Sequence, residues 1–411
     1  MLSKKKVLIA MGSFKDVFSP LESKNLIKNI LLESNYNFDI TTLSIADGGE
    51  YSHEVVKDNL NCIEINLKNI ISAHKKKVDS GYLLLDSKTA FISSSHILRL
   101  NNEDDKFKNP LNLTSFGLGQ LIKHAVISNK VSTIYIGLGG TNTADAGIGM
   151  LQALGINFLD KSNNQLFPND ENFFSGIDLI DIEGIDARGF NTLFSKVNII
   201  SLCDANIGIN EMSVPNNQKI STYFDDDRQY INSFLDRNIY KYCVNVKKIL
   251  GKELNLKSKF FGVAGGINIS LNYFPSMEMS LGINFFIDKL NLKKHINESD
   301  LVITGEGKFD NSLTGKAPVG ICQIAKKYNK EVLYLVGDVG DEYNAFFKNN
   351  IAYSMPPSAN ERGISTMISC HNFNKNMLIP LDKKAMKLTY RENTEIVFKE
   401  SIIEYLHTQG W

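Results

Sequence analysis

The chain contains 411 residues, of which 43% are hydrophobic and 22% are charged. One hydrophobic core rarely grows beyond roughly 250 to 300 residues, so we expect two domains and not a single domain or a disordered chain. The 45 Lys and Arg residues balance the 45 Asp and Glu residues, which excludes the clustered basic excess of a nucleic-acid-binding protein.

The beginning of the chain and its cysteines favour a cytoplasmic protein. The apolar run that follows Lys4-Lys5-Lys6 ends at Gly12 and is too short for a signal peptide. No stretch approaches the ~18 apolar residues of a membrane span. The five cysteines are odd in number and include no C-x-x-C pair, which is typical of reduced thiols. We therefore expect a cytoplasmic protein that does not bind membranes.

Short apolar runs rich in β-branched residues recur along the chain and are predicted to be buried parallel strands. In chain order they cover residues 7–10, 133–136, 197–200, 301–304 and 332–336. The last two are expected to stop at Gly305 and Gly337. Segments with helical periodicity, such as 119–127 and 321–328, lie between the runs, so the sequence predicts an α/β fold with mainly parallel strands. Ligands of such folds bind at the carboxyl ends of the strands.

The segment with the most glycines, residues 137–149, lies between a predicted strand and a predicted helix. Glycines let the backbone approach a phosphate, and the following helix would offer free N–H groups. No Gly-Lys-Ser/Thr follows, so the segment is not a P-loop. A tight turn with close packing explains the same pattern equally well.

A second polar segment, residues 304–318, also follows a predicted strand. It combines Glu306, Lys308, Asp310 and Lys316 with three glycines before a helix that should start near Pro318. Phosphoryl transfer needs cations around the phosphate, a carboxylate for Mg²⁺ and a base for the attacking hydroxyl. The segment could supply all three, although an exposed polar loop is the alternative.

The remaining polar or glycine-rich segments give weaker signals. Asp204 follows a predicted strand, where a helix cap or a turn is the alternative to a metal ligand. The turn at 262–266 fits close packing as well as ligand binding, and Asp225-Asp226-Asp227 is expected to form an exposed loop. Four histidines lack ligand spacing and are assigned no role: His53, His74, His96 and His124.

Several segments in order resemble the bacterial glycerate kinase family of the type I fold. The family's Asp-Ser-Phe-Lys-Gly, Asp-Gly-Gly-Glu-Gly and Thr-Ser-x-Gly-x-Gly-Gln-Leu are similar to residues 12–16, 47–51 and 114–121. Its Gly-Gly-Ser-Ala-Thr-Asn-Asp-Gly-Gly-Ala-Gly-Met, Cys-Asp-x-x-Asn and Gln-Lys-Gly elements resemble residues 139–150, 203–207 and 218–220. The strongest likeness is Asp300-Leu301-Val302-Ile303-Thr304-Gly305-Glu306-Gly307, continuing to Pro318. The resemblance covers nearly the whole chain.

The resemblance implies two α/β domains with a cleft between them. A Rossmann-like domain would comprise residues 1–75 and 290–411, and an inserted α/β domain residues 76–289. The implied reaction is phosphorylation of D-glycerate by ATP with Mg²⁺, giving 2-phosphoglycerate. The partners would be a small hydroxy acid and ATP, and the oligomeric state stays open, with a homodimer as one alternative.

The resemblance also implies site residues by position. Those expected to act on the substrate are Ser13, Lys15, Asp47, Asp204, Glu306, Lys308 and Asp310, with Asp204 and Asp310 also expected to hold the metal. Those expected near the nucleotide phosphates are Gly139, Gly140, Thr141, Asn142, Thr143, Gly265 and Gly266, with Lys219 and Lys316 as further candidates.

Departures from the family pattern leave two alternatives open. Gly12 replaces an Asp and Ala144 an Asn, which favours a relative that binds nucleotide without turnover. Tyr51 replaces a Gly, which favours a kinase of another hydroxy or sugar acid, because a phenol would change the volume of a pocket. Asp16 replaces a Gly and is the nearest carboxylate that could substitute for the one missing at position 12. Lys308 stands where the family commonly has Arg, which loses a bidentate fork.

Overall fold

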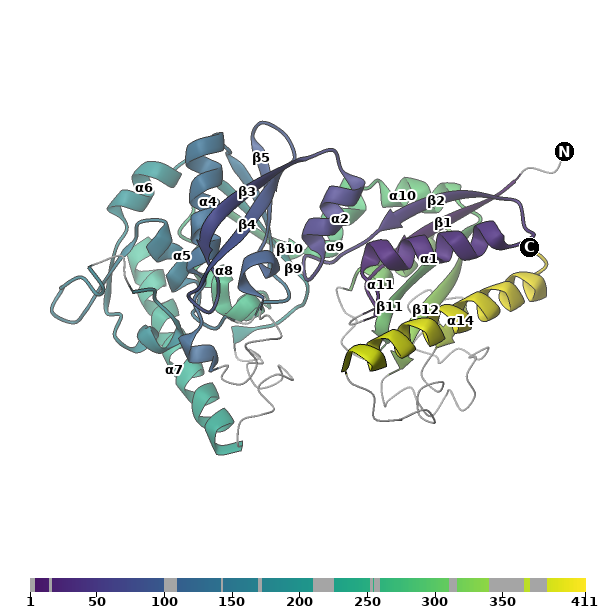
Figure 1. Cartoon of the computed structure of the whole chain (residues 1–411). Coiled ribbons are helices and arrows are strands. Elements are labelled where there is room, and N and C mark those ends of the chain that lie inside the picture. The colour runs from purple at the N-terminus through teal and green to yellow at the C-terminus, as the bar shows by residue number, and fades with distance from the viewer. Residues whose placement is uncertain are drawn as a thin grey trace. The chain divides into compact units, whose positions relative to one another are not determined.

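A computed structural model describes residues 4–14, 17–99, 109–141, 143–168, 172–209, 225–251, 254, 259–309, 316–339, 366–369 and 383–411. The contacts divide the chain into two compact units. Unit 1 consists of Met1–Asp47, Glu54–Leu60 and Ile283–Trp411. Unit 2 consists of Gly48–His53 and Asn61–Gly282. The chain is thus a mixed α/β protein in which one unit is assembled from both chain ends, and its elements are drawn in Figure 1.

Unit 1 is built on a sheet whose five described strands are all parallel, in the order β13-β12-β11-β1-β2. The strands are β1 (Lys5–Met11), β2 (Phe38–Ser44), β11 (Leu301–Phe309), β12 (Glu331–Val339) and β13 (Thr366–Ser369). The helices are α1 (Pro20–Glu33), α9 (Gly282–Lys289), α10 (Leu292–Glu298), α11 (Ala317–Lys327) and α14 (Lys383–Gln409), and α2 (Ser52–Asn59) has residues in both units.

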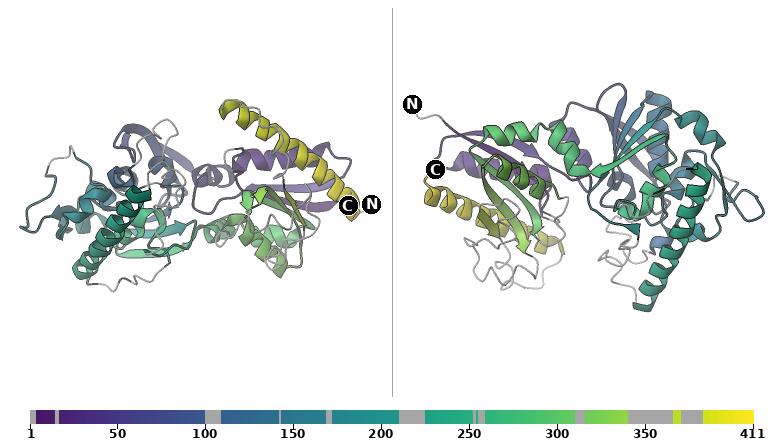
Figure 2. Two further views of the ribbon diagram at one scale, coloured as in Figure 1. Left: turned by 90° about the horizontal axis from the view of Figure 1, so that it is seen from below. Right: turned by 180° about the vertical axis from the view of Figure 1, so that it is seen from behind.

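Helices cover both faces of the unit 1 sheet. The helices α1 and α14 pack on one face, where their apolar side chains join Ile9, Ile303 and Leu333 in one core cluster. The helices α10 and α11 contact the strands from the opposite face, and Figure 2 shows this layered arrangement. Helix α1 begins where Ser19 forms a capping box with Glu22, with Pro20 as its first residue.

Two strands of unit 1 run further than the sequence predicted. The strands β11 and β12 were expected to stop at Gly305 and Gly337, but they pair as far as Phe309 and Val339. Glycine does not end either strand because it is needed for close approach: a Cβ at Gly305 would lie 2.2 Å from the carbonyl oxygen of Leu335. Glu306 and Lys308 therefore lie on a strand and not in a loop.

Unit 2 contains a six-stranded mixed sheet in the order β10-β9-β6-β5-β4-β3 and a small two-stranded sheet. The strands are β3 (Ile63–Ile71), β4 (Lys77–Leu84), β5 (Thr89–Ser93), β6 (Thr133–Gly137), β9 (Asn198–Cys203) and β10 (Ser276–Leu281), with the separate pair β7 (Asn157–Leu159) and β8 (Gly184–Asp186). The strands β5, β6, β9 and β10 are parallel, whereas β3 and β4 are antiparallel.

The helices of unit 2 share one large hydrophobic core with the sheet. They are α3 (Ser95–Leu98), α4 (Phe116–Asn129), α5 (Ile148–Ala153), α6 (Arg188–Phe194), α7 (Asp225–Leu250) and α8 (Ile267–Leu271), with 3₁₀ turns at Pro110–Asn112, Gly176–Ile180 and Val263–Gly266. The acidic triplet that begins at Asp225 was predicted to be a loop, but it forms the start of helix α7.

The unit boundaries can be compared with the predicted domain boundaries at 75/76 and 289/290. Judged by its contacts, the chain enters the long segment of unit 2 at Asn61 and re-enters unit 1 at Ile283. The earlier crossing follows from β3, which pairs with β4 and so belongs to the unit 2 sheet. Among the described residues, no helix is both long enough and apolar enough to cross a membrane.

Candidate active site

The candidate site of unit 1 lies where the strand order reverses. The chain runs from β1 outward to β2, and then from β11 outward to β12 on the other side of β1. Ligands of open parallel sheets bind outside the carboxyl ends of the strands at such a switch point. The backbone continues the pairing there, because Gly12 N donates to Gly305 O at 3.1 Å and Gly307 N to Ser13 O at 3.0 Å.

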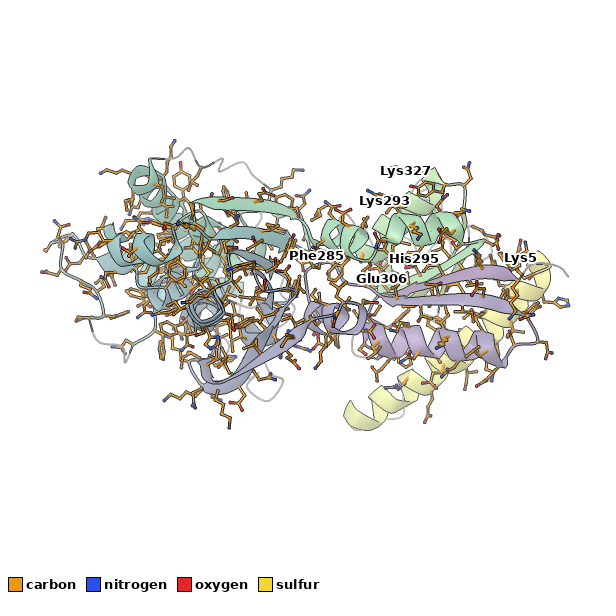
Figure 3. The ribbon with its side chains drawn as sticks, turned by 90° about the horizontal axis from the view of Figure 1, so that it is seen from above. Lys5, Phe285, Lys293, His295, Glu306 and Lys327 are labelled. Atoms are coloured by element: carbon orange, nitrogen blue, oxygen red, sulfur yellow. The ribbon has the colours of Figure 1, made fainter. Side chains whose placement is uncertain are left out.

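Glu306 and Lys308 extend from β11 at this edge. Two residues apart on a strand, they project to the same face. Tyr334 donates its hydroxyl proton to the Glu306 carboxylate, which fixes that side chain at the end of the sheet. Lys308 is exposed. Figure 3 shows Glu306 at the opposite end of the strands from Lys5, which starts β1.

Asp47 and Lys316 form an ion pair in the same unit. Lys316 Nζ lies 3.4 Å from Asp47 Oδ2, and the Asp47 side chain is 17% exposed. Lys316 is the N-cap residue of α11, and its side chain makes no capping hydrogen bond. Lys316 therefore does not cap the start of this helix, where the helix dipole favours anions.

Gly12 is packed more tightly than a loop glycine. A Cβ at this position would lie 3.0 Å from the Gly305 carbonyl oxygen and 3.4 Å from Cγ of Pro318. Any side chain here would have to displace its neighbours by a few tenths of an ångström. The Cβ of such a side chain would be directed toward the first turn of α11, so a carboxylate at position 12 would extend from there.

The candidate site of unit 2 lies at the carboxyl ends of its parallel strands. A Cβ at Gly139 would lie 2.4 Å from both Asp204 Oδ2 and the Cα of Gly49. A Cβ at Gly48, whose φ is +91°, would lie 2.6 Å from the Leu202 carbonyl oxygen. The segment after Asp47, the loop after β6 and Asp204 after β9 are thus brought together within one unit.

Thr143 has a buried hydroxyl without a hydrogen-bond partner in the described part of the chain. The residue is 3% exposed, and its Oγ1 makes no hydrogen bond. Gly140, three residues after the end of β6, is exposed, and Thr141 is half-buried. An orphaned donor beside exposed backbone is an arrangement that suits a phosphate oxygen.

The Gly265-Gly266 turn is explained by packing. A Cβ at Gly265 would lie 1.8 Å from the carbonyl oxygen of Thr143, and Gly266 has a φ of +88°. Ala146 N donates to Gly265 O at 3.0 Å. The turn therefore supports the loop after β6 from behind, and its glycines are required whether or not a nucleotide lies near.

Asp145 is a structural carboxylate that the sequence interpretation did not single out. It is fully buried and accepts hydrogen bonds from Ser115 N and Oγ at 2.8 and 2.7 Å and from Gly147 N and Gly149 N at 3.0 and 3.2 Å. Ser115 Oγ in turn accepts from Met150 N at 2.9 Å. Burial raises the pKa of Asp145 although all of these donors oppose the shift. The carboxylate fastens the start of α4 to the loop before α5.

Arg99 is a second residue that no sequence signal indicated. Its Nη2 lies 2.6 Å from Oε1 of Glu50, two residues after Gly48 in the same short segment. The Glu50 backbone nitrogen and Cβ both lie 3.4 Å from where a Cβ of Gly140 would be. The ion pair thus stands beside the exposed part of the loop after β6.

Four predicted site residues lie outside the described residues: Lys15, Asn142, Lys219 and Asp310. Asp16, the candidate substitute for position 12, lies outside them as well. Among the residues that are described, no group of three His, Cys, Asp or Glu side chains could hold a metal ion. Asp47 and Glu306 belong to unit 1 and Asp204 to unit 2.

Comparison with known proteins assigns the family. Residues 7–378 match the glycerate kinase family. The chain belongs to the glycerate kinase family. It is 31% identical to glycerate kinase of Haemophilus influenzae, over 85% of this chain and 90% of that protein. It is 30% identical to glycerate 2-kinase of Escherichia coli, over 84% of this chain and 88% of that protein.

The fold of the glycerate kinase family is also found by structural comparison. A crystal structure of a Salmonella typhimurium protein assigned as glycerate kinase 2 superposes with a TM-score of 0.71 at 25% identity. The likeness covers 99% of this chain and all of that one. The resemblance predicted from short motifs, the α/β fold and the classification as a kinase are therefore confirmed.

Two departures from the glycerate kinase pattern fall on unusual backbone. Tyr51 has a φ of +66° and Ala146 a φ of +51°, and the family motifs quoted above have Gly at both positions. Left-handed backbone costs a residue with a Cβ roughly 1–2 kcal/mol. The family glycine at these positions is thus explained by conformation. Ala144, the third departure, is 1% exposed and belongs to the core cluster, so its methyl group faces the interior.

Proposed function

We propose that this protein transfers the γ-phosphoryl group of ATP to a hydroxyl group of D-glycerate, forming 2-phosphoglycerate and ADP. The observation that carries the proposal is the match of residues 7–378 to the glycerate kinase family, together with near full-length likeness to proteins named glycerate kinase. In the reaction, the substrate oxygen bonds to the γ-phosphorus, the bond to the β-phosphate breaks, and a carboxylate takes the hydroxyl proton.

The proposed roles in unit 1 are electrostatic. Lys308 is an exposed cation at the carboxyl end of β11, suited to the oxygens of the transferring phosphoryl group or the substrate carboxylate. Glu306 is held by Tyr334 and positions this end of the strand. Ser13 and the start of α11 add polar groups around the switch point. We assign no proton acceptor among the carboxylates.

The proposed roles in unit 2 involve the nucleotide. The backbone around Gly139 and Gly140 and the orphaned Thr143 hydroxyl fit the phosphates of ATP, because they offer donors and lack obstructing side chains. Mg²⁺ is usually bound by one or two carboxylates together with substrate phosphates, and Asp204 is the carboxylate at this edge. When bound, the ion would neutralise charge on the phosphates. Asp204 would orient that ion, and Gly139 leaves room for its carboxylate.

A second candidate function is phosphorylation of a different hydroxy acid. Tyr51 favours it, because a partly buried phenol lies directly after Glu50 where the family motif has no side chain. A phenol in the substrate pocket would reduce the volume of the pocket and add a hydroxyl group. The pocket would then discriminate among acids by their size and their hydrogen bonding.

The test is a substrate panel with the full chain. Purified protein is incubated with ATP, Mg²⁺ and, in separate reactions, D-glycerate, L-glycerate, glycolate or lactate, and ADP release is measured. We expect D-glycerate to give the highest kcat/KM. Enolase then distinguishes the products, since it dehydrates 2-phosphoglycerate but not 3-phosphoglycerate.

The panel also separates the alternatives. A higher kcat/KM with another acid would replace D-glycerate as the substrate. ATP binding by calorimetry without ADP release from any acid would support a relative that binds nucleotide but does not turn over, and would overturn the kinase proposal.

A further inference from the structure

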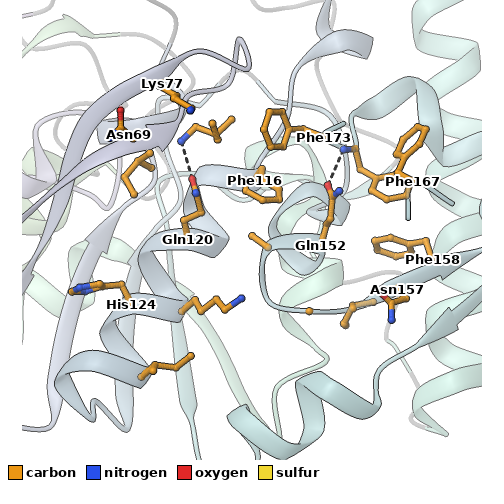
Figure 4. A pocket seen from close by; sticks show the side chains of 18 of the residues that line it. Asn69, Lys77, Phe116, Gln120, His124, Gln152, Asn157, Phe158, Phe167 and Phe173 are labelled. Atoms are coloured by element: carbon orange, nitrogen blue, oxygen red, sulfur yellow. Dashed lines mark hydrogen bonds between the residues drawn. The ribbon is translucent and has the colours of Figure 1, made fainter. Parts of the chain in front are cut away.

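Unit 2 contains a pocket of about 840 Å³ that includes none of the candidate site residues. It is lined by β3, the start of β4, α4, the end of α5 and the segment around β7, and Figure 4 shows it from close by. Its volume falls in the range of roughly 300–1,000 Å³ that is usual for small-molecule sites.

One side of the pocket is aromatic. Phe116 and Phe173 lie with ring centroids 4.7 Å apart, and Phe167 and Phe174 with centroids 4.6 Å apart. Gln152 holds this wall, because its Oε1 accepts from Phe174 N at 3.0 Å and its Nε2 donates to Asn172 O at 2.8 Å. The wall is therefore fixed by hydrogen bonds and offers flat apolar surfaces to a ring.

The charges around the pocket have one sign. Its lining includes Lys68, Lys77 and Lys123 but no Asp or Glu. None of these lysines forms an ion pair with a carboxylate in the described part of the chain. Figure 4 places Lys77 and His124 on one side of the view and Phe158 and Phe167 on the other. The lysines make the pocket attractive to an anion.

The uncharged polar groups near the lysines are also donors. Gln120 accepts from Ile71 N at 2.8 Å through Oε1, which leaves its Nε2 hydrogens to donate. Asn129 donates to the Tyr82 hydroxyl, which lies 2.9 Å from Nδ1 of His124. Burial raises the pKa of Tyr82, so its hydroxyl keeps the proton that it donates to Nδ1. When Nδ1 accepts that proton, Nε2 of His124 carries a hydrogen and is a donor.

We propose that this pocket binds a small amphipathic anion, a molecule with an aromatic ring system and one carboxylate, sulfonate or phosphate group. The ring would lie against Phe116, Phe167 and Phe173, and the anionic group would receive hydrogen bonds from Lys77, Lys123 and Gln120. The two lysines and the Gln120 Nε2 group are donors, which is why an anion and not a cation or an amine is expected beside them.

The proposal can be tested with 1-anilinonaphthalene-8-sulfonate, whose fluorescence rises in apolar surroundings, and with N-phenyl-1-naphthylamine, the same aromatic skeleton without the sulfonate. We expect the full chain to bind the sulfonate at least about tenfold more tightly, with an affinity that falls as salt is added. Equal affinities, or no salt dependence, would overturn the proposed anion preference.

Three variants test whether the probe binds in this pocket. Lys123→Glu, an exposed change on α4, should weaken sulfonate binding about tenfold or more and leave the neutral probe unchanged. Ser128→Trp, also exposed on α4 and lining the pocket, should weaken both probes by filling the space. Lys196→Glu is the matched control, because Lys196 is exposed in unit 2 but does not line the pocket.

Two results would refute the site. One is identical sulfonate binding by the wild type, Lys123→Glu and Ser128→Trp, with thermal midpoints showing that all three are folded. The other is displacement of the sulfonate by ATP, which would identify this pocket as the nucleotide site and not a separate one.

Discussion

The two units use their family motifs in different ways. In unit 1 the motif residues at the sheet edge are charged side chains, with Lys308 exposed and Lys316 paired to Asp47. In unit 2 the motif residues are mostly glycines and buried polar groups, and Asp145 is completely enclosed. The first set can act on a substrate, whereas much of the second shapes the backbone. A motif match therefore mixes residues that do chemistry with residues that hold a loop.

The largest effect should follow from removing the enclosed carboxylate of unit 2. Asp145→Ala leaves the donors of Ser115, Gly147 and Gly149 unpaired in the core, and we expect a loss of about 3–5 kcal/mol of unfolding free energy. Denaturant unfolding measures it. Asp186→Ala, which removes a carboxylate whose partner Arg188 is exposed, is the control and should cost far less. Comparable small losses in both would show that the Asp145 network contributes little.

The next effect should appear in turnover and not in stability. Lys308→Ala removes an exposed cation from unit 1, and we expect kcat to fall about a hundredfold or more, since a cation on a transferring phosphoryl group contributes several kcal/mol. Lys327→Ala, an exposed lysine at the end of α11, should leave the kinetics unchanged. If kcat is equal in both folded variants, Lys308 does not belong to the active site. The charged motif residues of unit 1 would then not differ in role from the structural motif residues of unit 2.

A smaller effect should come from the strained residue of unit 2. Tyr51→Gly removes left-handed strain at a φ of +66°, and we expect the unfolding free energy to rise by about 1 kcal/mol. Asn69→Gly, at a φ of +59°, is the control and should gain less, because Asn tolerates this conformation. A decrease in stability on replacing Tyr51 would mean that the contacts of the phenol outweigh its strain. The same variant, assayed on the acid panel, reports whether the phenol sets substrate choice.

The smallest effect concerns the start of α1 in unit 1. Partial burial raises the pKa of Glu22, but hydrogen bonds from Ser19 N at 2.8 Å and Arg391 Nη1 at 3.0 Å outweigh this and hold the pKa below its ordinary value of 4.5. A lowered carboxyl pKa contributes stability that is present above pH 4.5 and is lost as pH falls through the folded-state pKa.

We therefore expect Glu22→Gln to cost about 0.5–1 kcal/mol at neutral pH, a value reduced by solvent screening of this half-exposed side chain, and nothing at acid pH. Unfolding measured across pH tests this. Glu33→Gln is the control, because Glu33 pairs with Lys399 in an exposed bridge and should change stability less. A loss that does not depend on pH would exclude the charge of Glu22 as its cause.

Much of the fold could be predicted from local sequence patterns. Apolar runs gave the positions of β1, β6 and β9 because buried parallel strands are nearly continuous in hydrophobic residues. The ends of β11 and β12 could not be predicted, because glycine signals both a turn and a close approach of strands, and only the pairing decides which applies. The assembly of unit 1 from both chain ends came from the family resemblance and not from periodicity.

The sequence predicted some of the neighbours in the candidate site and missed others. The roles of Asp204 and Gly139 stay a prediction from the family resemblance, and the structure shows that the two residues are packed together, since a Cβ at Gly139 would lie 2.4 Å from Asp204 Oδ2. Asp145 was missed because one Asp among glycines carries no signal that it accepts hydrogen bonds from Ser115, thirty residues earlier. Arg99 was missed because its partner Glu50 is 49 positions away, and an exposed arginine gives no pattern.

The central strand of unit 1 has a consequence for the order in which the protein is made. Strand β1 pairs with β11, and Lys6 N bonds to the Asp300 carboxylate across 294 positions of sequence. During synthesis, all of unit 2 up to Gly282 emerges before any strand that can cover this side of β1. Strand β1 can pair early with β2, but its other edge stays open until β11 is made, and an open strand edge favours aggregation of the nascent protein.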